Sequence, residues 1–329
     1  MKDTKVLSGT AYSFEGKMPL RQAIPLGLQH VLAMFVGNLT PLLIITGACG
    51  LGVGSEFADL QVSLLQNAML VAGLVTLLQL FAIGPVGGKV PIIMGTSSGF
   101  IGVFNSVVAN MGGGVIAYGA IMGASIIGGL MEGVLGFFLK PLRRFFPPVV
   151  TGTVVLSIGL SLISVGIASF GGGSGAADYG SIENLLLATF VLVVILIVKH
   201  GTKGFTSTSS ILIGIIAGYI VAFIMGFVLP TTGVTADDVE YTKAWVLNWD
   251  KVREASWFAV PALMPVKIIF DWRAIVPVLI MFVVTAVETV GDISGVMEGG
   301  MGREATDKEL SGGVICDGLG STFAAIFGV

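Results

Sequence analysis

Charged residues are scarce in this sequence. Asp, Glu, Lys and Arg make up 11% of the 329 residues, whereas about a quarter of the residues are charged in ordinary soluble domains. The hydrophobic share is 54% and the mean hydropathy is +0.95. A charge content this low excludes a typical soluble domain and indicates a chain that crosses a membrane several times.

Cysteines and basic clusters are scarce as well. Cys49 and Cys316 each border an apolar run and form neither a disulfide framework nor a metal-ligand spacing. Lys and Arg are spread along the chain without a basic run, which gives no support to nucleic-acid binding. Residues 1–21 hold four basic residues but no apolar core, so they resemble a cytoplasmic lead-in rather than a signal peptide. We expect no cofactor, no metal and no nucleic-acid partner.

The sequence contains instead a series of apolar runs, each near the 20 residues that a helix needs to span a bilayer. Basic residues gather in every second loop between the apolar runs. By the positive-inside rule, this pattern places the N-terminus in the cytoplasm. The long polar stretch 230–273 is then an outer connection. We predict an all-α, multi-pass protein of the cell (plasma or inner) membrane with about nine spans, at 22–48, 62–84, 90–109, 115–139, 148–169, 182–199, 208–229, 274–297 and 311–329.

The third apolar run is interrupted. Glycines and a proline within 84–88 precede the β-prone Val90–Met94, and residues 95–99 read Gly-Thr-Ser-Ser-Gly. This pattern predicts a segment that is part extended and part helix. Non-helical backbone survives at membrane depth only where it is buried in protein or lines a cavity, so Ser97 and Ser98 are candidates to line a binding site. The alternative is that these serines only cap the following helix.

Two acidic residues in the run 274–297 are the strongest functional signal. An acidic residue at the centre of a spanning helix costs roughly 2.5–3.5 kcal/mol on insertion scales, so such residues usually face a protein interior or a wet cavity. Glu288 and Asp292 are four residues apart and therefore share one helix face. Glu288 lies roughly 16 Å from the inner boundary at a rise of 1.5 Å per residue. A transport site is the leading hypothesis; the alternatives are a structural carboxylate for Glu288 and an inner-end residue that reaches water for Asp292.

Two further polar residues are predicted at a similar depth in the membrane. Asp317 lies roughly 9 Å and His30 roughly 12 Å from the inner boundary by the same rise. Their alternatives are helix packing for Asp317 and a hydrogen bond between helices for His30. Glu132 is interpreted as an inner-end group that pairs with a basic residue or reaches water. An intramembrane enzyme that uses paired acids with a metal would need a second acid-rich cluster, which the other runs lack, so we expect no catalytic residues.

Five stretches, in order along the chain, carry a family resemblance: Gln29–Met34, Gly95–Ser98, Phe146–Thr153, Glu288–Asp292 and Gly312–Gly320. Together they resemble the nucleobase–ascorbate transporter family, also called nucleobase:cation symporter-2. The resemblance runs from about residue 20 to the last residue, and the order of several pieces makes it specific. Any one stretch alone would be a weak signal.

The resemblance implies a fold of fourteen spans in two inverted repeats of seven, divided into a core domain and a gate domain. The core would take residues 22–139 and 274–329, the gate 140–229, and 230–273 would be the outer loop. It further implies a homodimer and an elevator-like displacement of the core against the gate.

The resemblance also implies a substrate site between short extended segments of the third and tenth spans. Glu288 would accept N–H groups of a nucleobase, with Ser97 and Ser98 as further binding residues. Support of the site and cation coupling would fall to Asp292, Asp317 and His30.

Two departures from the family pattern bear on function. The tenth-span signature is not found before Val329, so the chain looks C-terminally truncated and should not transport as written. Ser98 stands where many purine-transporting relatives have an aromatic residue, which puts ring stacking in doubt. Asp292, where uracil permeases tend to have a histidine, favours a purine such as xanthine or uric acid.

We therefore expect an importer of an oxidised purine, coupled to protons or to sodium. A uracil permease of the same family is the nearest rival. An anion transporter of similar architecture is a more distant one, because such a protein would be expected to place basic or neutral groups at its site.

Overall fold

The structure is a computed structural model that describes residues 19–52, 55–139, 148–173, 176–203, 205–235, 238–249, 253 and 260–329. Nearly all of the predicted lead-in 1–21 lies outside the described residues, as do the basic stretch 140–147 and parts of the predicted outer loop.

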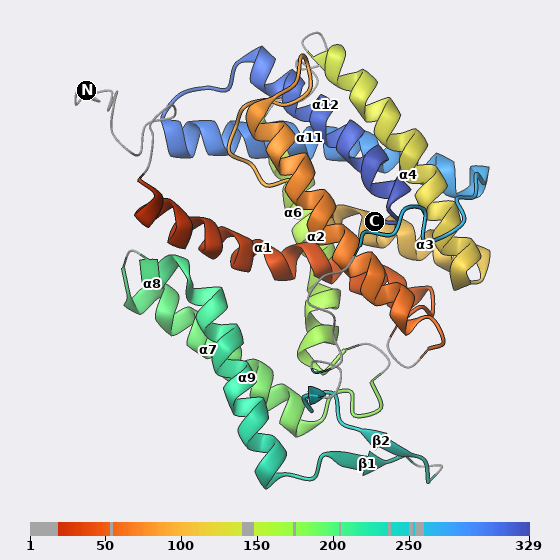
Figure 1. Ribbon diagram of the computed structural model, residues 1–329, viewed down its shortest axis with the longest axis vertical. Coiled ribbons are helices and arrows are strands. Elements are labelled where there is room, and N and C mark those ends of the chain that lie inside the picture. Colours follow the sequence, from red (N-terminus) through yellow and green to blue (C-terminus); the bar gives the residue numbers. More distant parts are fainter. Residues whose placement is uncertain are drawn as a thin grey trace. The chain divides into compact units, whose positions relative to one another are not determined.

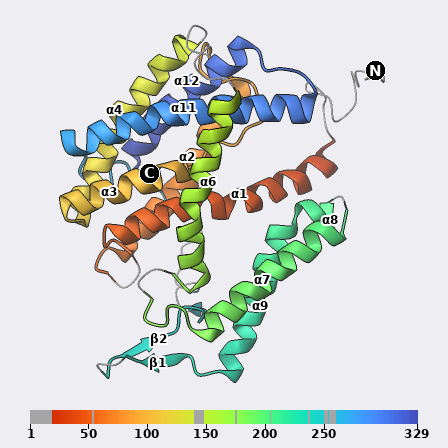
Figure 2. The same cartoon turned by 180° about the vertical axis from the view of Figure 1, so that it is seen from behind.

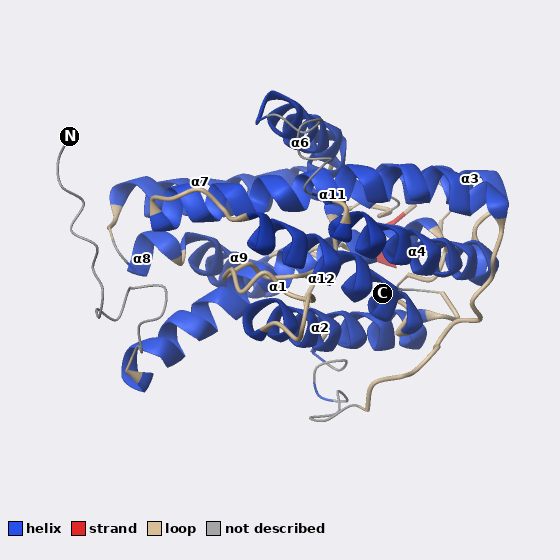
Figure 3. Cartoon of the chain, turned by 90° about the horizontal axis from the view of Figure 1, so that it is seen from above, coloured by secondary structure: helices blue, strands red, loops and turns tan. Residues whose placement is uncertain are grey.

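The described chain is mainly helical, as predicted, and its only named strands form one short hairpin (Figures 1 and 3). In chain order the elements are α1 (Leu20–Ala48), α2 (Ala58–Phe81), the 3-10 helix η1 (Ser98–Phe100), α3 (Ile101–Met111), α4 (Gly114–Phe137), α6 (Pro148–Phe170), α7 (Ile182–Gly201), α8 (Phe205–Thr208), α9 (Ser210–Val228), β1 (Thr232–Val234), β2 (Glu240–Thr242), α11 (Trp272–Met301) and α12 (Asp307–Ile326).

Six helices of the described chain are long and apolar enough to cross a membrane: α2, α4, α7, α9, α11 and the Gly152–Phe170 part of α6. Length and composition thus confirm a polytopic membrane protein, while the count of nine spans stays a prediction. The predicted run 90–109 is not one continuous helix, because helical structure there begins only at Ser98. This confirms the predicted break.

The chain divides into two compact units. The first contains Met34–Gly159 and Ala259–Val329 with the start of the chain to Leu26, and the second contains Gly27–Ala33 and Leu160–Phe258. The predicted core and gate boundaries, at 139 and 274, stay a prediction.

Glycines let α4 and α12 of the first unit approach until their backbones touch. A Cβ on Gly318 would lie 2.3 Å from the Gly133 nitrogen and 2.5 Å from the Gly129 carbonyl oxygen. Small residues are favoured where helices must pack closely in lipid, since the bilayer supplies no hydrophobic force between them. Both helices run beside α11, which completes this group (Figure 2).

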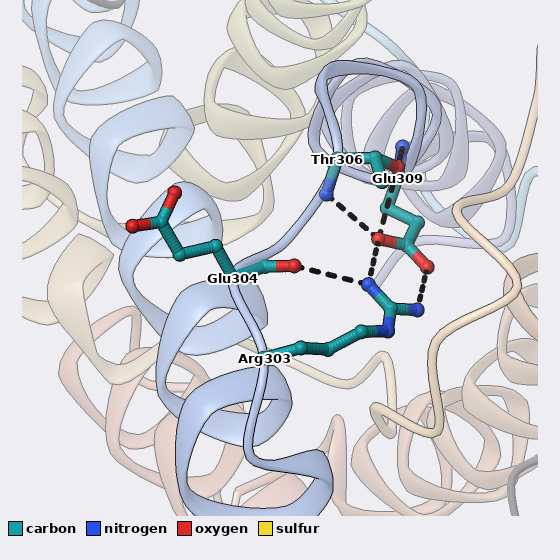
Figure 4. A network of polar contacts seen from close by, with 4 residues as sticks. All are labelled: Arg303, Glu304, Thr306 and Glu309. Carbon is teal, nitrogen blue, oxygen red and sulfur yellow. Dashed lines mark hydrogen bonds and ion pairs between the residues drawn. The ribbon is translucent and has the colours of Figure 1, made fainter.

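The turn between α11 and α12 is held by a capping box (Figure 4). Thr306 Oγ1 accepts the Glu309 N–H at 3.3 Å, and Glu309 Oε2 accepts the Thr306 N–H at 2.8 Å. Arg303 donates to both oxygens of Glu309, at 2.6 and 3.0 Å. Gly302, with φ +65°, ends α11 in the left-handed conformation that glycine adopts most readily. These contacts fix where α12 starts relative to the end of α11.

The other end of α11 is capped by Asp271. Its side chain accepts the Arg273 N–H at 2.9 Å and pairs with the Arg273 guanidinium at 2.7 Å. The hydrogen bonds from Arg273 lower the pKa of Asp271 to about 2. The cap therefore stays ionised at neutral pH, where its negative charge complements the positive end of the helix dipole.

The second unit contains α7, α9 and the hairpin. Gly214 and Gly218 bring α9 against α7, because a Cβ would lie 2.3 Å from Ile195 at the first and 2.7 Å from Val191 at the second. The hairpin pairs β1 and β2 antiparallel, with Gly233 opposite Tyr241.

A buried polar cluster joins the residues before α7 to those after the hairpin. Asn184 donates to the Gly171 carbonyl at 3.2 Å and to Asp178 Oδ2 at 3.1 Å. Asp178 Oδ2 also accepts the Ala244 N–H at 3.0 Å. These bonds satisfy backbone groups that would otherwise be left without partners away from water.

Replacing Gly318 by Ala should destabilise the first unit. The new methyl group would collide with backbone atoms of α4, which cannot move aside as a flexible side chain could. We expect a loss of about 1–3 kcal/mol or more in the free energy of unfolding, measured by thermal or denaturant unfolding in detergent. Gly295→Ala on α11 is the matched control, because nothing lies within 4 Å of its Cβ position. Equal stability of the two variants would contradict the close α4–α12 contact.

Candidate functional site

Glu288 faces residues 82–97, the non-helical segment that includes the interrupted part of the third run, as its predicted role requires. Ser97 Oγ lies 3.5 Å from Glu288 Oε2, at the limit of a hydrogen bond. Ser97 Oγ also accepts the Gly99 N–H at 3.2 Å and so serves as the N-cap of η1. From the sequence, capping of the next helix and lining of a site were alternative roles for Ser97. In the structure, its single hydroxyl is placed for both. It accepts from the backbone and can donate its proton to the carboxylate.

The segment that carries Ser97 has no helical hydrogen bonds of its own between residues 82 and 97, so other residues supply its partners. At its start, Gly87 donates its N–H to the Gly312 carbonyl at 2.9 Å, and Gly88 donates to Gln79 Oε1 at 3.0 Å. A Cβ on Gly88 or on Gly312 would lie within 2.5 Å of backbone oxygen. This end of the segment therefore lies directly on α12.

The end of the segment nearer Glu288 is held by α1 and α2. Asn38, which is 4% exposed, accepts the Thr96 N–H at 2.9 Å, and the Thr96 hydroxyl in turn contacts the Asn38 carbonyl oxygen. Thr76 accepts the Met94 N–H at 2.9 Å. Asn38 and Thr76 are not among the residues predicted from the sequence, although a polar side chain inside an apolar run is a signal that could have identified them.

Asp317 lies against α11 beside Glu288. Thr289, the next residue after Glu288, donates its hydroxyl to Asp317 Oδ2 at 2.5 Å. The charges of Asp292 and Asp317 both act on Glu288. Three of the predicted acidic residues are therefore close in space, contributed by α11 and α12.

The remaining predicted residues are placed differently. Asp292 lies one turn beyond Glu288 on α11 and is exposed, the placement that its water-reaching alternative requires. Ser98 is partly exposed and begins η1, and no described hydrogen bond joins its side chain to Glu288. His30 lies on α1 within residues 27–33, which belong to the second unit, and is exposed. Roles in the site for these three residues stay predictions, as do those of Glu288, Ser97 and Asp317.

The interpretation of Glu132 as an inner-end group that pairs or reaches water was wrong. Its side chain is 0% exposed, Oε1 lies 3.2 Å from the Thr285 hydroxyl oxygen, and Oε2 has no hydrogen-bond partner among the described residues. The cause is the close packing of α4 against α11 and α12, which covers this face of the helix. The flanking Gly128, Gly129 and Gly133 were the signal for such burial.

The chemistry of this arrangement is that of a hydrogen-bonding site. A carboxylate accepts hydrogen bonds from N–H groups, and a serine hydroxyl can accept or donate a hydrogen bond. The backbone of the non-helical segment supplies further polar groups. Groups of three or more His, Cys, Asp or Glu placed to hold a metal ion do not occur among the described residues. The side chains at hand therefore suit a small polar molecule with N–H donors.

Long apolar helices around an acidic residue and a broken segment place this chain among the polytopic membrane proteins. Residues 21–329 match the Permease family. The chain therefore belongs to this family, the nucleobase–ascorbate transporters or nucleobase:cation symporter-2 proteins, whose members are permeases rather than enzymes.

Individual relatives agree with this assignment. Xanthine permease XanP of Escherichia coli (strain K12) is 32% identical over 326 residues, covering 96% of this chain and 65% of XanP. Uric acid permease PucK of Bacillus subtilis (strain 168) is 34% identical over 309 residues, covering 93% of this chain and 64% of PucK. A protein of Clostridium perfringens is 36% identical over 328 residues, which is 100% of this chain and 66% of that protein. The chain spans about two thirds of the length of these relatives.

Replacing Asn38 by Ala should loosen the segment that carries Ser97. The substitution leaves the Thr96 N–H without its acceptor in a largely buried place, which costs about 1–3 kcal/mol. We expect a lower unfolding midpoint in detergent and faster hydrogen exchange of the amides at 94–97. Asn110→Ala is the control, because Asn110 is exposed at the end of α3 and should change the free energy of unfolding by less than about 0.5 kcal/mol. Unchanged exchange at 94–97 would show that Asn38 does not hold the segment.

Proposed function

We propose that this chain forms part of an importer of an oxidised purine, xanthine or uric acid, that works by cation symport and is coupled to protons. The observation that carries the proposal is the position of Glu288, on a spanning helix, within 3.5 Å of Ser97 on non-helical backbone. The similarity to proteins named as xanthine and uric acid permeases supports the choice of substrate.

The chemistry of the substrate fits these groups. Xanthine and uric acid present ring N–H donors next to carbonyl oxygens. Glu288 would accept one or two N–H groups, while Ser97 or segment backbone would donate to a carbonyl oxygen. Hydrogen bonds to an ionised carboxylate are about twice as strong as neutral ones, so the carboxylate would contribute most to recognition.

The acidic character of the site supports the choice of cation. Glu288 interacts with two other carboxylates, Asp292 and Asp317. Binding a proton here would relieve repulsion between like charges, and acidic residues inside membranes commonly serve as proton relays. Asp292, Asp317 and His30 are proposed to support this coupling, and sodium is the alternative ion.

The proposed movement is an elevator-like displacement of a core domain, residues 22–139 and 274–329, against a gate domain. The break before η1 supports it, because a site at a helix break can travel with its helix bundle as a rigid body. We further propose a homodimer in the cell membrane with a cytoplasmic N-terminus.

Replacing Glu288 by Gln in the full-length protein should abolish high-affinity uptake. The amide keeps the shape of the side chain but loses the charge-assisted hydrogen bonds, a loss of about 1.5–3 kcal/mol that corresponds to a roughly 10- to 150-fold weaker interaction. The measurement is uptake of radiolabelled xanthine and uric acid in cells that lack their own permeases.

The matched control is Glu298→Gln, an exposed carboxylate farther along the same helix, for which we expect near wild-type uptake. Unchanged xanthine and uric acid uptake by the Glu288 variant would refute the site. Uptake of uracil in place of the purines by the unchanged protein would assign the chain to the uracil permeases instead.

Proton coupling predicts that accumulation depends on the proton gradient. A protonophore should stop concentrative xanthine uptake, whereas replacement of sodium by choline in the medium should leave it unchanged, because only the proton moves with the substrate. Initial uptake rates under the two conditions give the measurement. Loss of uptake without sodium would identify sodium as the coupling ion.

A further inference from the structure

Glu132 is a buried acid for which the proposed site has no use. It lies on α4 with 0% exposure, and no described basic residue pairs with it. The charged groups that act on it are those of Asp317 and Glu288, which are acids themselves. Within the described part of the chain, one of its two oxygens, Oε2, has no hydrogen-bond partner.

Among the described residues, the elements packed against α4 place no basic side chain in a pair with Glu132. The segment before α11 also packs on α4, at Gly119 and Gly123, and its basic residue Lys267 is exposed. Helix α3 has no ionisable residue, and the two basic residues of α11 and α12 are both exposed, Arg273 being paired with Asp271. An ionised carboxylate buried without a cation is strongly unfavourable. The ionisable residues of α11 and α12 are Arg273, Glu288, Asp292, Glu298, Asp307, Lys308, Glu309, Cys316 and Asp317.

The hydrogen bonds of Thr285 indicate where a proton lies. Thr285 Oγ1 is 3.1 Å from the Phe282 carbonyl oxygen and 3.2 Å from Glu132 Oε1. A threonine hydroxyl has one proton to donate and oxygen lone pairs to accept with, and a carbonyl oxygen can only accept. Both contacts are full hydrogen bonds if Thr285 donates to Phe282 and Glu132 supplies the second proton.

We propose that Glu132 is a neutral carboxylic acid, and that its O–H donates to Thr285 and positions α11 against α4. Thr285 lies three residues before Glu288 and four before Thr289, so all three lie on neighbouring turns of α11. The bond thus holds α11 in the register that brings Thr289 to Asp317 and Glu288 to Ser97. Glu132 is a positioning residue and touches no substrate.

Infrared spectroscopy of the purified protein tests the proton directly. The wild-type protein should show a carbonyl-stretching band of a protonated carboxylic acid, present from mildly acidic to mildly alkaline pH, that is lost in Glu132→Gln. The control Glu298→Gln should keep this band, because Glu298 is exposed. Wild-type and Glu132→Gln spectra that agree in this region would overturn the proposal, as would a band that disappears between those pH values.

A second variant keeps the test independent of whether Glu132→Gln folds. Thr285→Val keeps the shape of the side chain but removes the hydroxyl, so the band should remain and shift as the carboxylic acid loses its hydrogen bond. An unshifted band would contradict the bond between Glu132 and Thr285.

Stability gives the matching readout. Glu132→Gln should keep the unfolding midpoint, because its amide N–H can donate to Thr285 in place of the acid. Thr285→Val should lower the midpoint by about 2 °C or more. A Glu132→Gln midpoint as low as that of Thr285→Val would also contradict the proposal. None of these measurements depends on transport, so a loss of the band in Glu132→Gln would stand even if Glu288→Gln left uptake unchanged.

Discussion

Direct backbone contact between α4 and α12 is the constraint on which the first unit depends. Gly129 on one helix and Gly318 on the other leave no room for a Cβ atom, and a Cβ on Gly318 would lie 2.3 Å from the Gly133 nitrogen. Because the helices are this close, the face of α4 that carries Glu132 is closed off, and Asp317 on α12 comes within reach of α11. The burial of one acid and the placement of another thus follow from the same small residues.

A non-helical segment persists among these spanning helices because neighbouring elements supply its hydrogen-bond partners. Backbone groups in lipid must find partners inside the protein. Gly312 on α12 accepts one N–H of the segment, and the side chains of Gln79, Thr76 and Asn38 accept others. The segment is therefore fixed at both ends, and Ser97 is presented to Glu288 from rigid supports. The proposed recognition of a nucleobase would depend on such preorganisation.

The sequence could predict the features that depend on local chemistry. An acid inside an apolar run identified Glu288, and glycines around a β-prone stretch identified the break that presents Ser97, because each signal lies within a few neighbouring residues. The environment of Glu132 could not be predicted in this way. Its partner Thr285 is 153 residues away, and its burial depends on how three helices pack. The sequence gives the depth of a residue along its helix, but it does not determine which face of the helix packs against a neighbouring helix.

The carboxyl groups of this unit differ in how completely the protein satisfies them. Asp317 receives a short hydrogen bond from Thr289, and Glu132 is enclosed beside Thr285. Among the described residues, Glu288 has only the long contact to Ser97, which leaves most of its hydrogen-bonding capacity unused there. A partly buried carboxylate with free capacity is costly unless a ligand or a proton completes it. Under the proposed function, Glu288 would therefore be the acid of the three whose free energy changes most when a substrate with N–H donors binds.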